Sequence, residues 1–209
     1  MEAIIISGYL HNLSNNIIDF IKGNDVFVHT WLDNDNVRWI SKLERYRKYT
    51  NSLNIVTENP LYDIKLYSYF YSTTSAVKSI PDIDKYGKVV KFKPNLHDGI
   101  EYKGNLADYF YKARISSQPL LNDYKEEDCI YGTTYYKTID ERIFSGYPLA
   151  FKKLFHILDY KTMMIDLNTS LVEKYGSNYE GSIFWTEWCK KNDVPFIIDT
   201  DLKIPNNKM

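Results

Sequence analysis

The chain has 209 residues, of which 44% are hydrophobic and 25% are charged, and its formal net charge is -1. This composition is typical of a folded globular protein and excludes a disordered chain, and the near-zero charge gives no general attraction to nucleic acid. From this charge we expect no nucleic-acid partner. The apolar runs are short and Glu2 stands where a signal peptide would be basic, so we also expect no transmembrane segment and no signal peptide. Two cysteines make neither a disulfide framework nor a zinc site, which favours a cytoplasmic location.

The first half of the chain shows short apolar runs that alternate with stretches of helical periodicity. In chain order the expected elements are a strand within 2–10 that runs into a loop at Ser7 and Gly8, a helix at 14–25, a strand at 25–31, a helix at 36–49, a strand at 52–58, a helix at 66–80 and a strand at 85–94. This alternation predicts an α/β fold with a mostly parallel sheet flanked by helices on both faces.

The regular alternation of strands and helices ends after residue 98. The expected elements are a strand at 99–102, a helix at 105–115, a strand at 128–136, a helix at 138–158 that is interrupted near Gly146, a helix at 179–192 and a strand at 194–199. We expect a single domain over residues 1–209, with a nucleotide-binding half at about 1–98. The second half, at about 99–203, would form the opposite wall of a cleft on the acceptor side.

Common catalytic fingerprints are missing from the sequence. It contains no G-x-G-x-x-G, no Walker A motif and no nucleophile elbow, so dinucleotide oxidoreduction, P-loop phosphoryl transfer and serine hydrolysis lack their usual signals. The four histidines have no metal-ligand spacing. They are His11, His29, His97 and His156.

Pairs of aspartates at D-x-D spacing, which can hold a divalent cation, occur three times and are therefore unspecific. They are Asp33/Asp35, Asp82/Asp84 and Asp199/Asp201. The second pair precedes a strand and fits solvated surface. The first pair follows the strand at 25–31, where open α/β sheets bind ligands, but it also fits an ordinary helix-entry loop.

Three polar side chains share one face of the strand at 85–94. Lys91, Lys93 and Asn95 are two residues apart, and alternate residues of a strand point the same way. Two lysines on an inner strand are costly unless an anion meets them, so the pattern indicates an anion site. The alternative is an edge strand whose lysines extend their amino groups into solvent.

Five stretches carry a resemblance to a known family. In chain order they are IIISGYLHN, VFVHTW, YSTTSAVKSI, KVVKFKPNLHD and TIDERIFSG. Together they resemble the small GT-A-type glycosyltransferases of large DNA viruses and of bacterial surface-polysaccharide clusters. In that family the first strand commonly contains I-S-G-x-x-R, the second ends in H-T-W, a helix with Y-S precedes a strand with R-x-R-x-D, and a later helix opens on an Asp. The resemblance rests on the order and spacing of these five stretches and not on any one motif, and it spans roughly residues 3–198.

The resemblance implies site residues position by position. The loop after the first strand would face the nucleotide with Ser7, Gly8 and Tyr9. The end of the second strand would line the base or ribose with His29, Thr30 and Trp31. Lys91 and Lys93 would meet the diphosphate.

Two positions depart from the family pattern. His11 replaces the usual Arg, and Asn95 replaces the Asp that would face the metal or the donor sugar. Asn95 keeps an oxygen for Mn²⁺ or Mg²⁺ but lacks the formal charge that a hard cation prefers. Asp98 would supply the missing carboxylate in a shifted site; otherwise the lysines alone would hold the donor.

Asp140 falls on the later acidic position of the family and is the candidate catalytic base, with Glu141 beside it. A simpler explanation for Asp140 is a favourable charge in the first turn of a helix. Glu180, at the start of the helix at 179–192, is likewise either a second catalytic carboxylate or a favourable charge in the first turn of its helix. Tyrosines of the helix at 66–80 would stack on sugar or base or else pack the core. They are Tyr67, Tyr69 and Tyr71.

The sequence thus predicts a GT-A-like glycosyltransferase that moves a sugar from a UDP-, GDP- or dTDP-sugar to a hydroxyl of a glycan acceptor, assisted by Mn²⁺ or Mg²⁺. For a viral protein the location would be the host cytoplasm. The alternative is a catalytically degenerate module that binds nucleotide sugar or glycan without turnover. A sugar-nucleotide-modifying enzyme is the third possibility, which the missing dinucleotide fingerprint disfavours. The donor, the acceptor and the stereochemistry stay open.

Overall fold

The computed structural model describes residues 1–11, 13, 17–60, 65–93, 125–135, 138–177, 179 and 181–198. The expected strand at 99–102 and helix at 105–115 lie outside these residues, as do Asn95, Asp98, Glu180 and the pair Asp199/Asp201.

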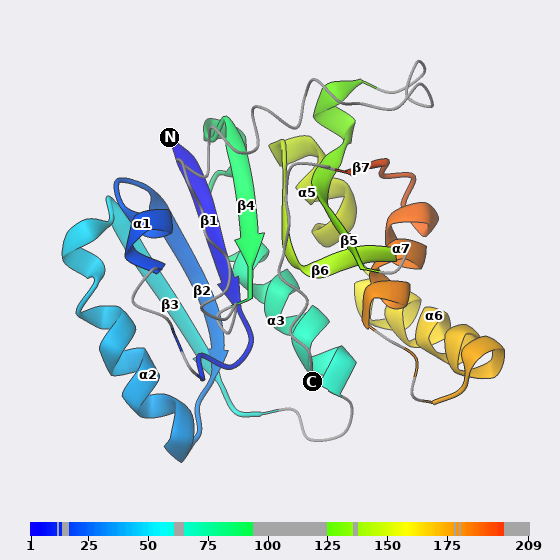
Figure 1. The fold of residues 1–209 in the computed structure, drawn as a ribbon, viewed down its shortest axis with the longest axis horizontal. Helices are drawn as coiled ribbons and strands as arrows, with labels where there is room; N and C mark the ends of the chain where they lie inside the picture. The colour runs from blue at the N-terminus through cyan, green and yellow to red at the C-terminus, as the bar shows by residue number, and fades with distance from the viewer. Residues whose placement is uncertain are drawn as a thin grey trace.

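The described residues form one seven-stranded sheet (Figure 1). Its strands are β1 (Glu2–Ser7), β2 (Asp25–Trp31), β3 (Ser52–Glu58), β4 (Lys88–Phe92), β5 (Ile130–Tyr135), β6 (Thr138–Gly146) and β7 (Phe196–Ile198). The spatial order is β3-β2-β1-β4-β6-β5-β7. Only β6 runs antiparallel to its neighbours; the other pairings are parallel. The predicted α/β fold with a mostly parallel sheet is confirmed.

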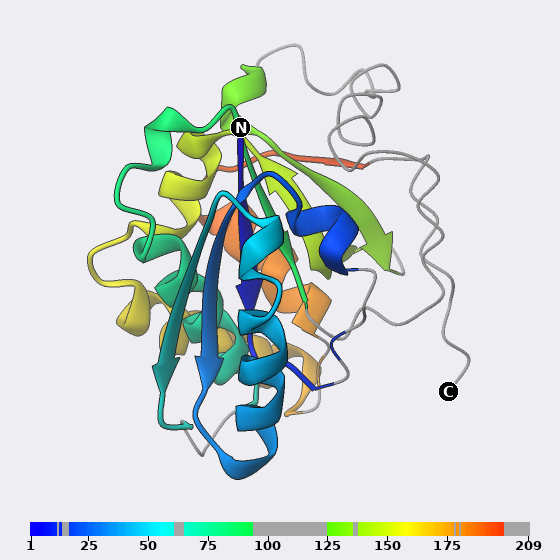
Figure 2. The ribbon, with the colours of Figure 1, turned by 90° about the vertical axis from the view of Figure 1, so that its left-hand side faces the viewer.

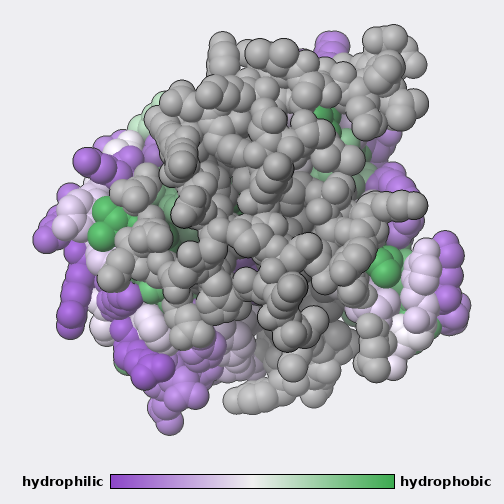
Figure 3. Space-filling model, in the orientation of Figure 1, coloured by the Kyte–Doolittle hydropathy of each residue, from purple (hydrophilic) through white to green (hydrophobic). Residues whose placement is uncertain are grey.

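Helices cover both faces of the sheet, as Figure 2 shows. They are α1 (Ile17–Ile21), α2 (Asn34–Glu44), α3 (Lys65–Lys78), α5 (Pro148–Phe155), α6 (Tyr160–Tyr175) and α7 (Gly181–Lys191). Short 3-10 turns are η1 (Arg47–Tyr49), η2 (Ile83–Lys85) and η5 (Glu126–Asp128). Hydrophilic side chains gather over the outward side of α2 (Figure 3). Among the described residues, no helix is both long and apolar enough to cross a membrane.

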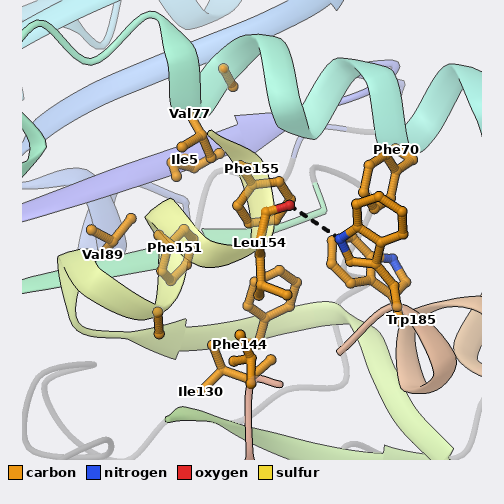
Figure 4. Packing of buried hydrophobic residues seen from close by; sticks show 14 of the residues in the cluster. Ile5, Phe70, Val77, Val89, Ile130, Phe144, Phe151, Leu154, Phe155 and Trp185 are labelled. Atoms are coloured by element: carbon orange, nitrogen blue, oxygen red, sulfur yellow. Dashed lines mark hydrogen bonds between the residues drawn. The ribbon is translucent and has the colours of Figure 1, made fainter. Parts of the chain in front are cut away.

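The sheet separates two apolar cores because successive strand residues point to opposite faces. Ala3 and Ile5 of β1 pack on the side of α3, α5 and α7, whereas Ile4 and Ile6 pack on the side of α1 and α2. The first core is strongly aromatic (Figure 4). It includes Phe70, Phe144, Phe155, Trp185 and Trp188, and the Trp188 indole N–H donates to the Leu154 carbonyl at 3.1 Å.

The helix expected over 138–158 is wrong in its first part. Residues Thr138–Gly146 form β6, and only Pro148–Phe155 is helical. Ile143 lies in one core and the adjacent Phe144 in the other, which a strand allows because it alternates sides. Pairing with β4 and β5 therefore overrides the local helical pattern. Helix α6, which sequence periodicity did not indicate, buries Tyr160, Met164 and Leu171 but leaves Ile165 exposed.

Asp25 ties three elements together at the amino edge of the sheet. Its carboxylate accepts hydrogen bonds from the Tyr86 hydroxyl at 2.7 Å and from the Ser52 hydroxyl at 2.8 Å, and Lys85 Nζ lies 3.6 Å away. Burial by itself would raise the pKa of Asp25, but these hydrogen bonds and the lysine outweigh it and hold the pKa below its usual value.

We therefore expect Asp25→Asn to lower the free energy of unfolding at pH 7 by about 2 kcal/mol, the scale of hydrogen bonds to a charged group. Because the folded-state pKa is depressed, this advantage of the wild type is present above about pH 4 and disappears as the pH falls further. Urea unfolding at pH 7 and pH 3 measures it. Asp166→Asn, at an exposed position of α6, is the control. An Asp25→Asn variant as stable as this control at pH 7 would contradict the assignment.

Candidate functional site

A topological switch point lies between β1 and β4. The chain runs outward from β1 to β2 and β3 and then returns to β4 on the other side of β1. The connections to β2 and β3 carry α1 and α2 on one face, and the connection to β4 carries α3 on the other. Open α/β sheets bind ligands outside the carboxyl ends of the strands at such a point. In this chain those ends lead into Gly8 and Lys93.

The chain turns sharply at Gly8, directly after β1. Gly8 has a φ of +94°, which favours glycine, and an added Cβ would meet the Tyr69 ring at 3.5 Å. Its N–H donates to the Ser72 hydroxyl of α3 at 2.7 Å and to the His29 carbonyl at 3.1 Å. The turn is thus held against both α3 and β2.

The residues beside this turn are oriented by α3 and by ring stacking. The hydroxyls of Ser7 and Thr73 are 2.8 Å apart, and both residues are buried. Tyr9 is 39% exposed, and its ring stacks on His11 with a centroid distance of 5.1 Å and an interplanar angle of 12°. The edge therefore presents an accessible aromatic surface next to buried hydroxyls.

Lys91 and Lys93 share a face, as the sequence predicts. Both amino groups lie over the Tyr69 ring, with Nζ 4.3 Å and 5.2 Å from its centroid. Strand β4 is an inner strand, between β1 and β6, and Lys91 is fully buried while Lys93 is half-buried. The edge-strand alternative is therefore wrong. The Lys91 amino group is thus buried against aromatic rings at the edge where open α/β sheets bind ligands.

The end of β2 contributes to both faces of the sheet. His29 and Trp31 point to the α3 side, where their rings meet edge-on at 5.2 Å and Trp31 stacks on Tyr71 at 6.1 Å. Thr30 points to the opposite side, where its hydroxyl accepts a hydrogen bond from the Asn36 amide at 2.6 Å. All three predicted residues are buried.

Two structural connections at this edge were missed by sequence reasoning. Asn36 of α2 accepts the Leu10 N–H at 2.9 Å and donates to the Trp31 carbonyl, so it joins the loop after β1 to the end of β2. Ser72, Thr73 and Thr74 of α3 are completely buried. The run of hydroxyl residues within one helix is the available signal in the sequence, because Ser and Thr are unfavourable in a helix interior unless their hydroxyls find partners.

The buried His29 lies between the buried Ser72 and the partly exposed Glu58. Nδ1 lies 2.9 Å from the Ser72 hydroxyl, and Nε2 lies 3.4 Å from Glu58 Oε1 without forming a hydrogen bond to any described residue. The Tyr71 hydroxyl donates to the other Glu58 oxygen at 2.9 Å. Burial lowers the pKa of His29, and the Glu58 carboxylate offsets this only in part.

The backbone places Asp140 at the same edge of the sheet. Ile143 pairs with Phe92, near the carboxyl end of β4, and Asp140 comes three residues earlier in the antiparallel β6. The β5–β6 register shifts between Gly132 and Thr134, opposite the stretch that contains Asp140. The expected helix start at Asp140 is wrong, so the helix-dipole explanation no longer applies. The Asp140 and Glu141 side chains lie outside what the structure describes.

The aspartate pairs that the structure describes have structural contacts. Asp33 caps α2 by accepting the Asn36 N–H at 2.8 Å, and Asp82 caps η2 by accepting the Asp84 N–H at 3.2 Å. Asp84 also pairs with Lys152. Within the described ranges, no cluster of three or more His, Cys, Asp or Glu side chains could hold a metal ion. The predicted metal ligands Asn95 and Asp98 lie outside these ranges.

Comparison with solved structures identifies similar folds. The apo form of the glycosyltransferase GlyE from Streptococcus pneumoniae TIGR4 aligns with a TM-score of 0.50 and 11% identity, over 95% of this chain and 45% of GlyE. A second GlyE structure aligns with a TM-score of 0.49 and 8% identity, over 93% of this chain and 44% of that one. The chain thus shares its fold with the glycosyltransferase GlyE. At this identity the likeness shows the fold alone, and the chain spans less than half the length of GlyE.

Mouse xyloside xylosyltransferase 1, in its apo form, aligns with a TM-score of 0.46 and 9% identity, over 95% of this chain and 85% of that one. No protein-family model matches the sequence, and no curated protein matches it.

The lowered pKa of His29 predicts a loss of stability in acid. The folded protein holds His29 neutral while the unfolded chain protonates it near pH 6.5, so this contribution is present above about pH 6.5 and is lost as the pH falls below it. We expect the drop in Tm between pH 7.5 and pH 5.5 to be smaller in His29→Gln than in the wild type. His11→Gln, outside this arrangement, is the control, and equal drops in both variants would contradict a buried neutral His29.

Proposed function

We propose that this protein is a glycosyltransferase that moves a sugar from a nucleotide-sugar donor to a hydroxyl of a glycan acceptor. One observation carries the proposal: Lys91 and Lys93 extend from the carboxyl end of β4 onto the same face, beside the Gly8 turn at the switch point. The fold, which is shared with GlyE, supports the reaction class.

The two lysines match the chemistry of a nucleotide diphosphate. Charge builds on the diphosphate as its bond to the anomeric carbon of the sugar breaks, and preorganised cations stabilise that charge most where water is excluded. Lys91 is buried and acts as a fixed cation, whereas the half-buried Lys93 is the more accessible partner. Gly8 lets the ligand approach the backbone closely because it has no side chain.

The remaining roles follow from position. Tyr9, stacked on His11, offers an exposed ring for the nucleobase. Asp140, whose backbone lies at the same edge, is the proposed base that takes the proton from the acceptor hydroxyl. Asn95 and Asp98 are the proposed ligands of Mn²⁺ or Mg²⁺, and such an ion would add to the neutralisation of the diphosphate.

A second candidate function is donor or glycan binding without turnover. It is favoured by Asn95, which has no formal charge where the family pattern has an Asp. In this case the lysines hold the diphosphate and no cation is required.

Thermal unfolding against UDP-, GDP- and dTDP-sugars, each with Mn²⁺, Mg²⁺ or EDTA, tests the proposal. At about a hundred times its dissociation constant a donor adds roughly 2.7 kcal/mol, which raises Tm by about 5 to 11 °C in a chain of this size. We expect a shift with one nucleotide class that requires the cation, together with release of the free nucleoside diphosphate in the presence of a glycan acceptor. A shift that survives EDTA without turnover favours the binding module. No shift with any donor would refute both.

The lysines can be tested separately. Lys93→Gln should weaken donor binding by about tenfold, because it removes one charge-assisted contact to the diphosphate. Lys88→Gln removes a lysine charge from the first residue of β4, at the end of the strand opposite to Lys93, and should leave the affinity within about twofold. Isothermal titration of the donor at two salt concentrations provides the measurement. Equal effects of the two substitutions would place the diphosphate elsewhere.

A further inference from the structure

The Ser72 hydroxyl uses its whole hydrogen-bonding capacity at the ends of β1 and β2. It donates to the His29 carbonyl at 2.9 Å and accepts the Gly8 N–H at 2.7 Å. A hydroxyl has one proton and two acceptor sites, so the remaining site faces His29 Nδ1 at 2.9 Å. One buried oxygen thus links the turn after β1 to both the backbone and the ring of His29.

Both ring nitrogens of His29 face polar groups. Nδ1 lies 2.9 Å from the Ser72 hydroxyl, and Nε2 lies 3.4 Å from the partly exposed Glu58 carboxylate. The ring is further enclosed by Trp31 and Tyr71, which meet it edge-on at 5.2 Å and 5.8 Å.

We infer that Ser72 and His29 are positioning residues for the donor site. They act through the Gly8 turn and do not themselves contact the donor. The inference rests on the proposed function, because the turn matters only if the donor binds beside it. Without the Ser72 hydroxyl, the buried Gly8 N–H keeps only its longer bond to the His29 carbonyl, at 3.1 Å, and the His29 ring loses its partner at Nδ1. The turn that carries Tyr9 is then less restrained.

Helix α3 offers a matched control. Thr74 lies two residues after Ser72 and is equally buried, but its hydroxyl has no hydrogen-bond partner among the described residues. Ser72→Ala and Thr74→Val therefore each remove one buried hydroxyl from the same helix, and only the first removes the link to Gly8.

Two measurements on the wild type, Ser72→Ala and Thr74→Val separate the inference from the proposed function. The first is the hydrogen-exchange rate of the Gly8 amide without ligand. We expect it to rise about tenfold in Ser72→Ala, the loss of roughly one hydrogen bond, and to stay unchanged in Thr74→Val. The second is the dissociation constant of UDP, GDP or dTDP, whichever the wild type binds. We expect it to rise about threefold to tenfold in Ser72→Ala and by less than about twofold in Thr74→Val.

Conservative changes at His29 provide a rescue test. The Asn side chain places a hydrogen-bonding group near the position of Nδ1, whereas Leu has none. His29→Asn should therefore keep the slow Gly8 exchange and the nucleotide affinity better than His29→Leu.

The outcomes are distinct. Unchanged Gly8 exchange in Ser72→Ala overturns the positioning role, whatever the protein binds. Faster exchange with unchanged nucleotide affinity also overturns it, because the turn would then lie outside the donor site. A wild type that binds none of the three diphosphates overturns the proposed function and the donor part of this inference, while the exchange rates still decide whether Ser72 holds the turn.

Discussion

Parallel pairing of β1 with β2 on one side and with β4 on the other is the constraint on which the rest of the structure depends. Each parallel connection must cross a face of the sheet, so α1 and α2 cover one face and α3 covers the other. Between β1 and β4 the crossovers pass to opposite faces of the sheet, so no crossover covers the carboxyl ends of these two strands. Gly8 and Lys93 lie at this place, so the proposed donor site falls at the centre of the sheet.

Polarity in the sheet is concentrated at this edge. The buried parts of β1 and β4 are apolar up to Ile6 and Val90, and buried polar side chains then appear on the α3 side. They are Ser7, His29, Ser72, Thr73 and Lys91. Burying such groups lowers the stability of the folded protein unless they are paired. The hydrogen bonds among the neutral members offset this loss in part, and Lys91 lies against the faces of Tyr69 and Phe144.

The site was predictable where it follows from strand geometry. The alternation of Lys91 and Lys93 with apolar residues placed both on one face, and the glycine after the first apolar run marked the turn at Gly8. The burial of Lys91 was not predictable, because it depends on β6 pairing beside β4. Asp140 shows the same limit: a Thr-Ile-Asp-Glu stretch fits a helix start locally, and only pairing with distant strands makes it a strand.

The sequence by itself determined the α/β class and the shared face of the two lysines, because both follow from periods of two and 3.6 residues in the order of apolar and polar residues. Tertiary structure alone decided the order of the strands, the antiparallel direction of β6 and the link from Gly8 through Ser72 to His29. These three residues are separated by 21 to 64 positions in the chain. Their hydrogen bonds form only when α3 packs across the ends of β1 and β2, and no local pattern encodes that packing.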